Sequence, residues 1–176
     1  MRGKIVVFLV LLSGVVVGLA GLRYTSDPSP VYDRFDQRRD PLPADVTGPR
    51  LLVEKAGDFD RIDFEPLAPD AQGIQRGHAS YKELGESEIE LTVQQIDPQR
   101  GLEELSAVQK TFENDTNVSR LVNHSDAQTP YLYAVYAADG RATYEFVWIN
   151  NGWLMRASTN QADAEALVRF ANAYPN

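Results

Sequence analysis

The chain has 176 residues, of which 24% are charged and 43% are hydrophobic, a balance that excludes a fully disordered or low-complexity protein. It contains no cysteine, which excludes disulfide bonds, thiolate zinc sites, iron–sulfur clusters, a cysteine nucleophile and a lipidated N-terminal cysteine. The formal net charge is −8. This length suits one domain with additional segments.

An uncharged segment, Ile5–Leu22, follows the short basic head Met1–Lys4. As a helix, its 18 residues would be about 27 Å long, close to the roughly 30 Å hydrocarbon core of a bilayer. The sequence therefore predicts a transmembrane anchor over residues 1–23, and a cleaved signal peptide is the alternative. Because a short basic head seldom crosses a membrane, we expect a single-pass protein with a cytoplasmic N-terminus and an extracytoplasmic domain, periplasmic if the chain is bacterial.

Three glycines, Gly14, Gly18 and Gly21, recur at helical spacing within the predicted anchor. On a helix they form one smooth stripe, and small residues in this pattern let a neighbouring helix approach closely. We therefore expect a helix partner in the bilayer, either a second copy or another membrane protein. The alternative is that glycine is simply common in membrane helices.

Residues 24–49 are rich in proline and carry balanced charge, which predicts a linker. Residues 50–176 then form one domain, with eleven Lys/Arg against twenty Asp/Glu, a net charge of −9. An acidic domain without a basic cluster repels phosphate backbones. We expect no nucleic-acid partner.

The sequence of the domain predicts many strands and two helices. Alternating polar and apolar residues, β-prone runs and turn dipeptides such as Asp139-Gly140 and Asn151-Gly152 predict strands, and apolar residues spaced three and four apart predict helices. The expected strands are 51–55, 59–65, 78–84, 88–96, 117–124 and three within 131–158, and the expected helices are 98–114 and 161–174. We expect an α+β, two-layer domain in which both helices pack on a curved antiparallel sheet.

No motif for catalysis, phosphate binding or metal binding is present. The two histidines, His78 and His124, lie far apart in the sequence. An acidic run from Asp58 to Glu65 continues into a predicted strand, whose faces alternate, so its carboxylates need not converge on a cation. We expect no catalytic residue, no cofactor and no metal site.

The predicted strand that contains Tyr144, Phe146 and Trp148 has these three aromatic side chains on one face. They are either core beneath the helices or an open apolar face for a ligand or a docking protein.

Three Asn-x-Ser/Thr triplets begin at Asn114, Asn117 and Asn123. In a secreted eukaryotic chain they would be glycan acceptors, and in a bacterial chain they would mean little. In either case they indicate a polar, exposed stretch over residues 114–125.

From these features we expect a non-catalytic, membrane-anchored accessory protein: a subunit, assembly factor or adaptor of a membrane protein complex. The alternative is a tethered or secreted binding domain for a small apolar ligand.

Overall fold

The computed structural model describes residues 42, 46, 48–84, 87–127, 129–159 and 163–174. The predicted anchor, with Gly14, Gly18 and Gly21, lies outside these residues, as does most of the predicted linker. Among the described helices, none is long and apolar enough to cross a bilayer.

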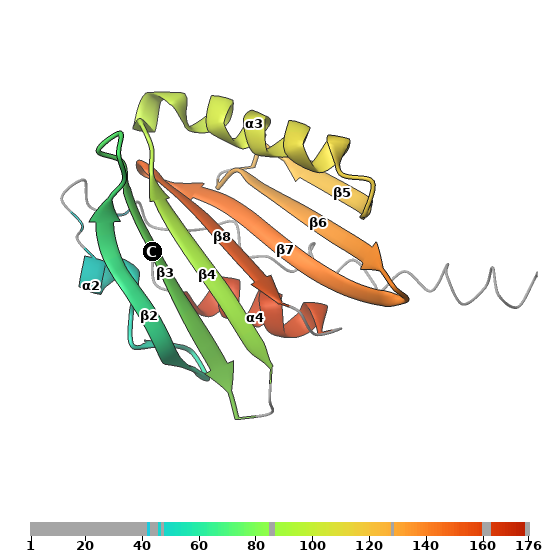
Figure 1. Ribbon diagram of the computed structural model, residues 1–176, viewed down its shortest axis with the longest axis horizontal. Coiled ribbons are helices and arrows are strands. Elements are labelled where there is room, and N and C mark those ends of the chain that lie inside the picture. Colours follow the sequence, from blue (N-terminus) through green and yellow to red (C-terminus); the bar gives the residue numbers. More distant parts are fainter. Residues whose placement is uncertain are drawn as a thin grey trace, which may run out of the picture. The chain divides into compact units, whose positions relative to one another are not determined.

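The domain is α+β, as expected, and is built on one antiparallel sheet of eight strands in the order β1-β2-β3-β4-β8-β7-β6-β5 (Figure 1). The strands are β1 (Lys55–Ala56), β2 (Phe59–Pro69), β3 (Gln75–Glu83), β4 (Glu88–Gln95), β5 (Val118–His124), β6 (Tyr131–Ala138), β7 (Arg141–Asn150) and β8 (Trp153–Thr159). The helical elements are α2 (Gly48–Leu51), the short 3₁₀ helix η2 (Pro98–Arg100), α3 (Gly101–Asn114) and α4 (Ala164–Ala173).

Two meanders make up this sheet. Strands β1 to β4 pair in chain order, and so do β5 to β8. The meanders join where β4 pairs with β8, in a register that sets Leu91 opposite Ala157 and Val93 opposite Met155. The helix α3 lies in the connection between the two meanders, and α4 follows the last strand.

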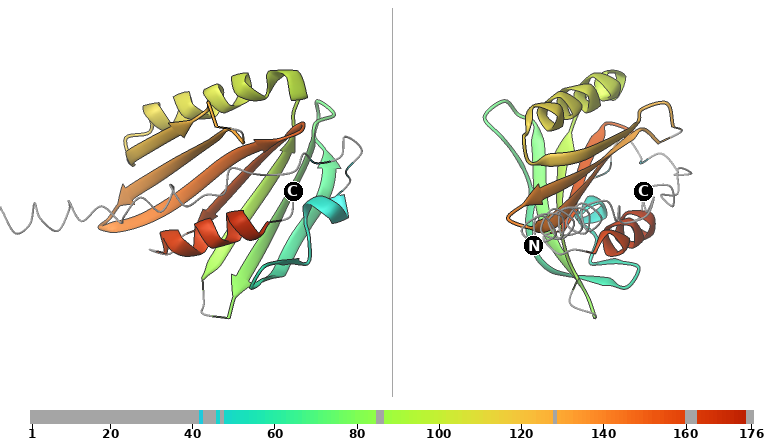
Figure 2. Two further views of the ribbon diagram at one scale, coloured as in Figure 1. Left: turned by 180° about the vertical axis from the view of Figure 1, so that it is seen from behind. Right: turned by 90° about the vertical axis from the view of Figure 1, so that its right-hand side faces the viewer.

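The helices α3 and α4 lie on opposite faces of the sheet (Figure 2). The prediction that both helices pack on one face, in two layers, is therefore wrong. Leu105 and Phe112 of α3 share a cluster with Val147 of β7. The next residue of that strand, Trp148, points to the other face and meets Tyr174, just beyond α4, with ring centroids 6.0 Å apart. Because neighbouring residues of a strand face opposite sides, a central strand that is apolar on both faces is covered on both.

Local sequence explains how the helices begin. Asp97 accepts a hydrogen bond from the Gln99 amide (2.9 Å) ahead of Pro98, as expected for the start of the first helix. The α4 helix begins in the same way, with the Asp163 carboxylate accepting from the Ala166 amide (2.9 Å). Both caps satisfy backbone N–H groups that have no partner within the helix.

The predicted strand at 51–55 is wrong. Leu51 ends the α2 helix, and only Lys55 and Ala56 form a strand. Leu51 and Leu52 are buried, and Leu52 packs with Leu67 over the space left by Gly77, where a Cβ atom would lie 3.0 Å or less from both side chains. An apolar run alone does not separate a strand from a short helix that is packed on a sheet.

The described part of the predicted linker contacts the domain. Leu42 and Val46 are buried. The Leu42 amide donates to Asn150 Oδ1 (2.9 Å), and Asn151 Nδ2 donates to the Leu42 carbonyl oxygen. Leu42 therefore belongs to the fold and is held at the turn between β7 and β8.

Candidate functional surface

The aromatic side chains of β7 lie in the core beneath α4. Phe146 and Trp148 are fully buried, and Tyr144 is 4% exposed. Phe146 contacts Trp148 edge to face, and Tyr133 stacks on Tyr144 at a ring-centroid distance of 6.2 Å. These three side chains therefore belong to the core and do not form an open apolar face, because nine-tenths or more of each is removed from solvent.

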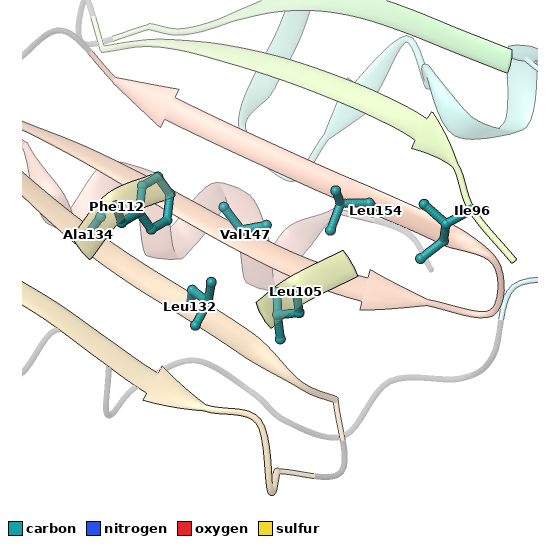
Figure 3. Close-up of a cluster of buried hydrophobic side chains, with 7 residues drawn as sticks. All are labelled: Ile96, Leu105, Phe112, Leu132, Ala134, Val147 and Leu154. Atoms are coloured by element: carbon teal, nitrogen blue, oxygen red, sulfur yellow. The ribbon is translucent and has the colours of Figure 1, made fainter. Parts of the chain in front are cut away.

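The opposite face has an apolar part and a polar part. Its apolar part lies under α3, where seven buried side chains form one cluster that holds the helix on β6, β7 and β8 (Figure 3). The members are Ile96, Leu105, Phe112, Leu132, Ala134, Val147 and Leu154. Beyond this cluster the same face becomes polar on β3, β4, the end of β8 and Glu145 of β7. We call this second part the polar face.

Strand registers place the residues of the polar face. Directly opposite residues of antiparallel strands share a face. One row therefore runs from His78 through Thr92 to Arg156, and the next runs from Ser80 through Glu90 and Ser158 to Glu145. The rows bring together residues from two hairpins, β3–β4 and β7–β8, that are far apart in the sequence.

Glu90 is the centre of one polar contact on this face. His78 Nε2 lies 2.6 Å from Glu90 Oε2, and the Ser80 hydroxyl donates to the same oxygen at 2.8 Å. Because both groups meet one carboxylate oxygen, the serine hydroxyl is not aligned on the imidazole, as a serine nucleophile activated by histidine would be. The geometry is that of a cross-strand histidine–carboxylate contact reinforced by a hydroxyl.

Glu145 is the centre of a second and more deeply buried contact. This carboxylate is 8% exposed, and Arg156 Nε and Nη2 each lie 2.6 Å from its Oε1. The Tyr136 hydroxyl donates to Oε2 at 3.0 Å. Burial, followed by the negative charge of Glu145, raises the pKa of Tyr136. The buried carboxylate is thus paired and hydrogen-bonded, which is the condition for tolerating a charge in the interior.

The acidic run and His124, the other candidate groups from the sequence, make contacts of their own. In the acidic run, Asp60 pairs with Lys55 (3.2 Å), and Asp63 accepts from the Phe64 amide (2.8 Å). The part of the chain that the structure describes holds no group of three His, Asp or Glu side chains arranged for a metal ion. His124 stacks on Tyr131, with ring centroids 4.7 Å apart.

Sequence reasoning missed both carboxylate-centred contacts. The alternation in β4 does mark Glu90 as water-facing, and an isolated glutamate in the apolar β7 strand is itself a signal. Their partners come from neighbouring strands, and alternation within one strand does not say which side chains of two strands meet. The strand registers supply this missing information.

No protein-family model matches the chain, and no curated protein matches it. Among solved structures, the chain is similar to the crystal structure of a GTP binding regulator from Thermotoga maritima, with 14% sequence identity and a TM-score of 0.45. The alignment covers 72% of this chain and 84% of that chain. A similarity of this degree supports no inference about function.

Proposed function

We propose that the protein is a non-catalytic accessory protein, anchored in a membrane by Ile5–Leu22 and presenting its acidic domain on the extracytoplasmic side. It acts there as a subunit, assembly factor or adaptor of a membrane protein complex. The observation that carries the proposal is the length of the uncharged segment, which has no polar face to offer water.

The chemistry of the domain is compatible with this role. Its two carboxylate-centred contacts tie strands together, with Glu90 linking β3 to β4 and Glu145 linking β6, β7 and β8. Such contacts stabilise a sheet without activating a nucleophile. The alternative, a binding domain for a small apolar ligand, relied on Tyr144, Phe146 and Trp148, and their burial removes the observation that favoured it.

Membrane fractionation of the full chain tests the anchor. We expect the protein in the membrane pellet after alkaline carbonate extraction, with its first residues present by mass spectrometry. Recovery of the intact chain in the aqueous fraction would overturn the proposal, and recovery of a chain that begins after residue 20 would favour the cleaved signal peptide.

Purification in mild detergent tests the partner. We expect the full chain to bring down a defined membrane protein or a second copy, and Gly14→Leu with Gly18→Leu to abolish that association because leucine side chains hold the helices apart. Val16→Leu is the matched control, since residue 16 lies on the opposite side of the helix from the glycine stripe. Equal association of all three proteins would contradict the role of the stripe.

A further inference from the structure

The sequence contains one Asn-Gly dipeptide, Asn151-Gly152, and it forms the turn between β7 and β8. Deamidation of asparagine is fastest before glycine. The backbone nitrogen of the next residue attacks the side-chain carbonyl carbon, and glycine has no Cβ atom to obstruct that attack. Asn151 is exposed, so water reaches the side chain. The turn therefore combines a labile dipeptide with access to solvent.

The Asn151 carboxamide is also the group that holds Leu42. Its Nδ2 donates to the Leu42 carbonyl oxygen, and the neighbouring Asn150 Oδ1 accepts from the Leu42 amide at 2.9 Å. Because Leu42 is only 4% exposed, water is a poor replacement for the lost donor. A carboxylate in place of the carboxamide has no hydrogen to donate and sets a negative charge beside the carbonyl oxygen. Deamidation of Asn151 would therefore break this contact.

The turn between β6 and β7 shows that the same backbone conformation accepts a carboxylate. Asp139 and Gly140 have φ of 52° and 73°, and Asn151 and Gly152 have φ of 38° and 86°. Aspartate in one turn thus occupies the position that asparagine has in the other. Conversion of Asn151 to aspartate should leave the hairpin in place and remove the contact with Leu42.

The folded turn restrains the reaction. Attack requires the carboxamide carbon to approach the Gly152 nitrogen, whereas the hydrogen bond to Leu42 keeps the carboxamide elsewhere. Gly152 is held as well, because its carbonyl oxygen accepts from the Ile96 amide (2.8 Å) and Pro98 packs against it. The reaction therefore requires the turn to open first.

We propose that Asn151 is a site of spontaneous deamidation and that this reaction and the Leu42 contact exclude one another. The Gly152 nitrogen gives its proton to water and attacks Cγ of Asn151, forming an N–C bond. The bond from Cγ to the amide nitrogen breaks, and ammonia leaves with a proton from water. Water then opens the cyclic imide to aspartate or isoaspartate. The contact with Leu42 ends irreversibly, because neither product carries the amide donor. This proposal does not depend on the membrane location proposed above.

Incubation of the purified full chain in mildly alkaline buffer tests the site. Tryptic peptide 142–156 contains Asn150, Asn151 and no other asparagine. We expect its mass to change by the replacement of NH₂ with OH, at residue 151 by fragmentation, with heavy oxygen taken up from labelled water. Asp139→Asn introduces a second Asn-Gly dipeptide in the matching turn and is the control. Persistence of the Asn151 amide after the introduced asparagine has reacted would overturn the proposal.

The rates of the two asparagines test the restraint. Each rate in the folded chain is divided by the rate of the same asparagine in the chain unfolded by denaturant, which removes the influence of sequence neighbours. We expect folding to slow Asn151 roughly fivefold more than the asparagine introduced by Asp139→Asn, because only Asn151 loses a hydrogen bond to Leu42 when it reacts. Equal slowing of the two would overturn the mutual exclusion.

Hydrogen exchange of the Leu42 amide measures the release. Asn151→Asp supplies the aspartate product as a single species, and the Leu42 amide should exchange roughly fivefold faster in this variant than in the parent protein. Asp139→Asn should leave the exchange rate unaltered. An unaltered rate in Asn151→Asp would show that the contact survives a carboxylate and would overturn the proposed release.

Discussion

Burial raises the pKa of several tyrosine side chains in the part of the domain that the structure describes. Tyr81 is fully buried, and its hydroxyl donates to the Val53 carbonyl oxygen (2.9 Å). Burial raises the pKa of Tyr81 from its usual 10.0 to about 12, against a lowering by Arg61. Burial likewise raises the pKa of Tyr174. These phenols remain protonated in the folded chain at a pH where an unfolded chain has lost the protons.

This difference makes stability depend on pH in the alkaline range. Between about pH 10 and pH 12 the unfolded chain binds fewer protons at Tyr81 than the folded chain, so the free energy of unfolding falls as pH rises. Below pH 10 the contribution of Tyr81 is fully present. We expect Tyr81→Phe to make the decline between pH 10 and 12 shallower, measured by denaturant unfolding at a series of pH values.

Phe170→Leu is the control for that measurement, because it lowers stability at the ring that contacts Tyr81 (centroids 4.9 Å apart) without removing a phenol. Its unfolding free energy should decline with the same slope as that of the parent protein. Identical slopes for Tyr81→Phe and the parent protein would contradict the prediction.

At the scale of elements, two hairpin turns share a backbone conformation and differ in their surroundings. Asp139-Gly140 and Asn151-Gly152 all have positive φ, as the sequence predicts for type I′ turns. A Cβ atom on Gly140 would meet nothing within 4 Å, whereas one on Gly152 would lie 3.1 Å from Pro98 Cγ and 3.4 Å from the Ile96 carbonyl oxygen.

These surroundings predict unequal effects of one substitution. Gly140→Ala should lower the free energy of unfolding by about 1–2 kcal/mol, the cost of a left-handed conformation for a residue with a Cβ atom. Gly152→Ala should lower it further, because Pro98 must also move. Denaturant unfolding of the two variants measures the difference, and equal losses would show that the Pro98 contact is unimportant.

The turn between β7 and β8 also holds Leu42. Asn151→Gly keeps the positive φ and removes the hydrogen bond to the Leu42 carbonyl oxygen. Loss of about 1 kcal/mol predicts an exchange rate of the Leu42 amide that rises roughly fivefold in hydrogen-exchange experiments. Asp139→Gly makes the same backbone change in the other turn and should leave that rate unaltered. A rate that rises equally in both variants would argue against the contact.

At the scale of the whole molecule, the sheet separates two hydrophobic cores. Phe112 of α3 packs on one face, and Phe170 of α4 packs on the other, where its ring lies 5.4 Å from that of Phe59. Side chains divided by a sheet share no contacts, so their energetic effects should be independent.

A double-mutant cycle tests this separation. Phe112→Leu and Phe170→Leu should each cost about 1–3 kcal/mol, and the double variant should lose the sum within about 0.5 kcal/mol. Phe59→Leu with Phe170→Leu should depart from additivity, because these rings touch. The free energies come from denaturant unfolding, and strong coupling across the sheet would contradict the two-core arrangement.

The sequence predicts the elements of this fold better than their arrangement. The strands around Asp139-Gly140 and Asn151-Gly152 and both main helices follow from local turn chemistry, caps and periodicity. The side of the sheet that each helix covers does not, because β7 is apolar on both faces and offers either one. The predicted turn at Asn151-Gly152 brings β7 beside β8, but the hydrogen bonds of Glu145 with Arg156 and Tyr136 depend on side-chain geometry that the sequence does not give.

The order in which the strands are synthesised has a consequence for how the protein folds. β4 is complete at Gln95, yet its second partner, β8, begins only at Trp153. Until β8 has been synthesised, β4, with Ile89, Leu91 and Val93 on its apolar face, can pair only with β3. Because this pairing closes the longest loop between neighbouring strands of the sheet, the joining of the two meanders should limit the folding rate.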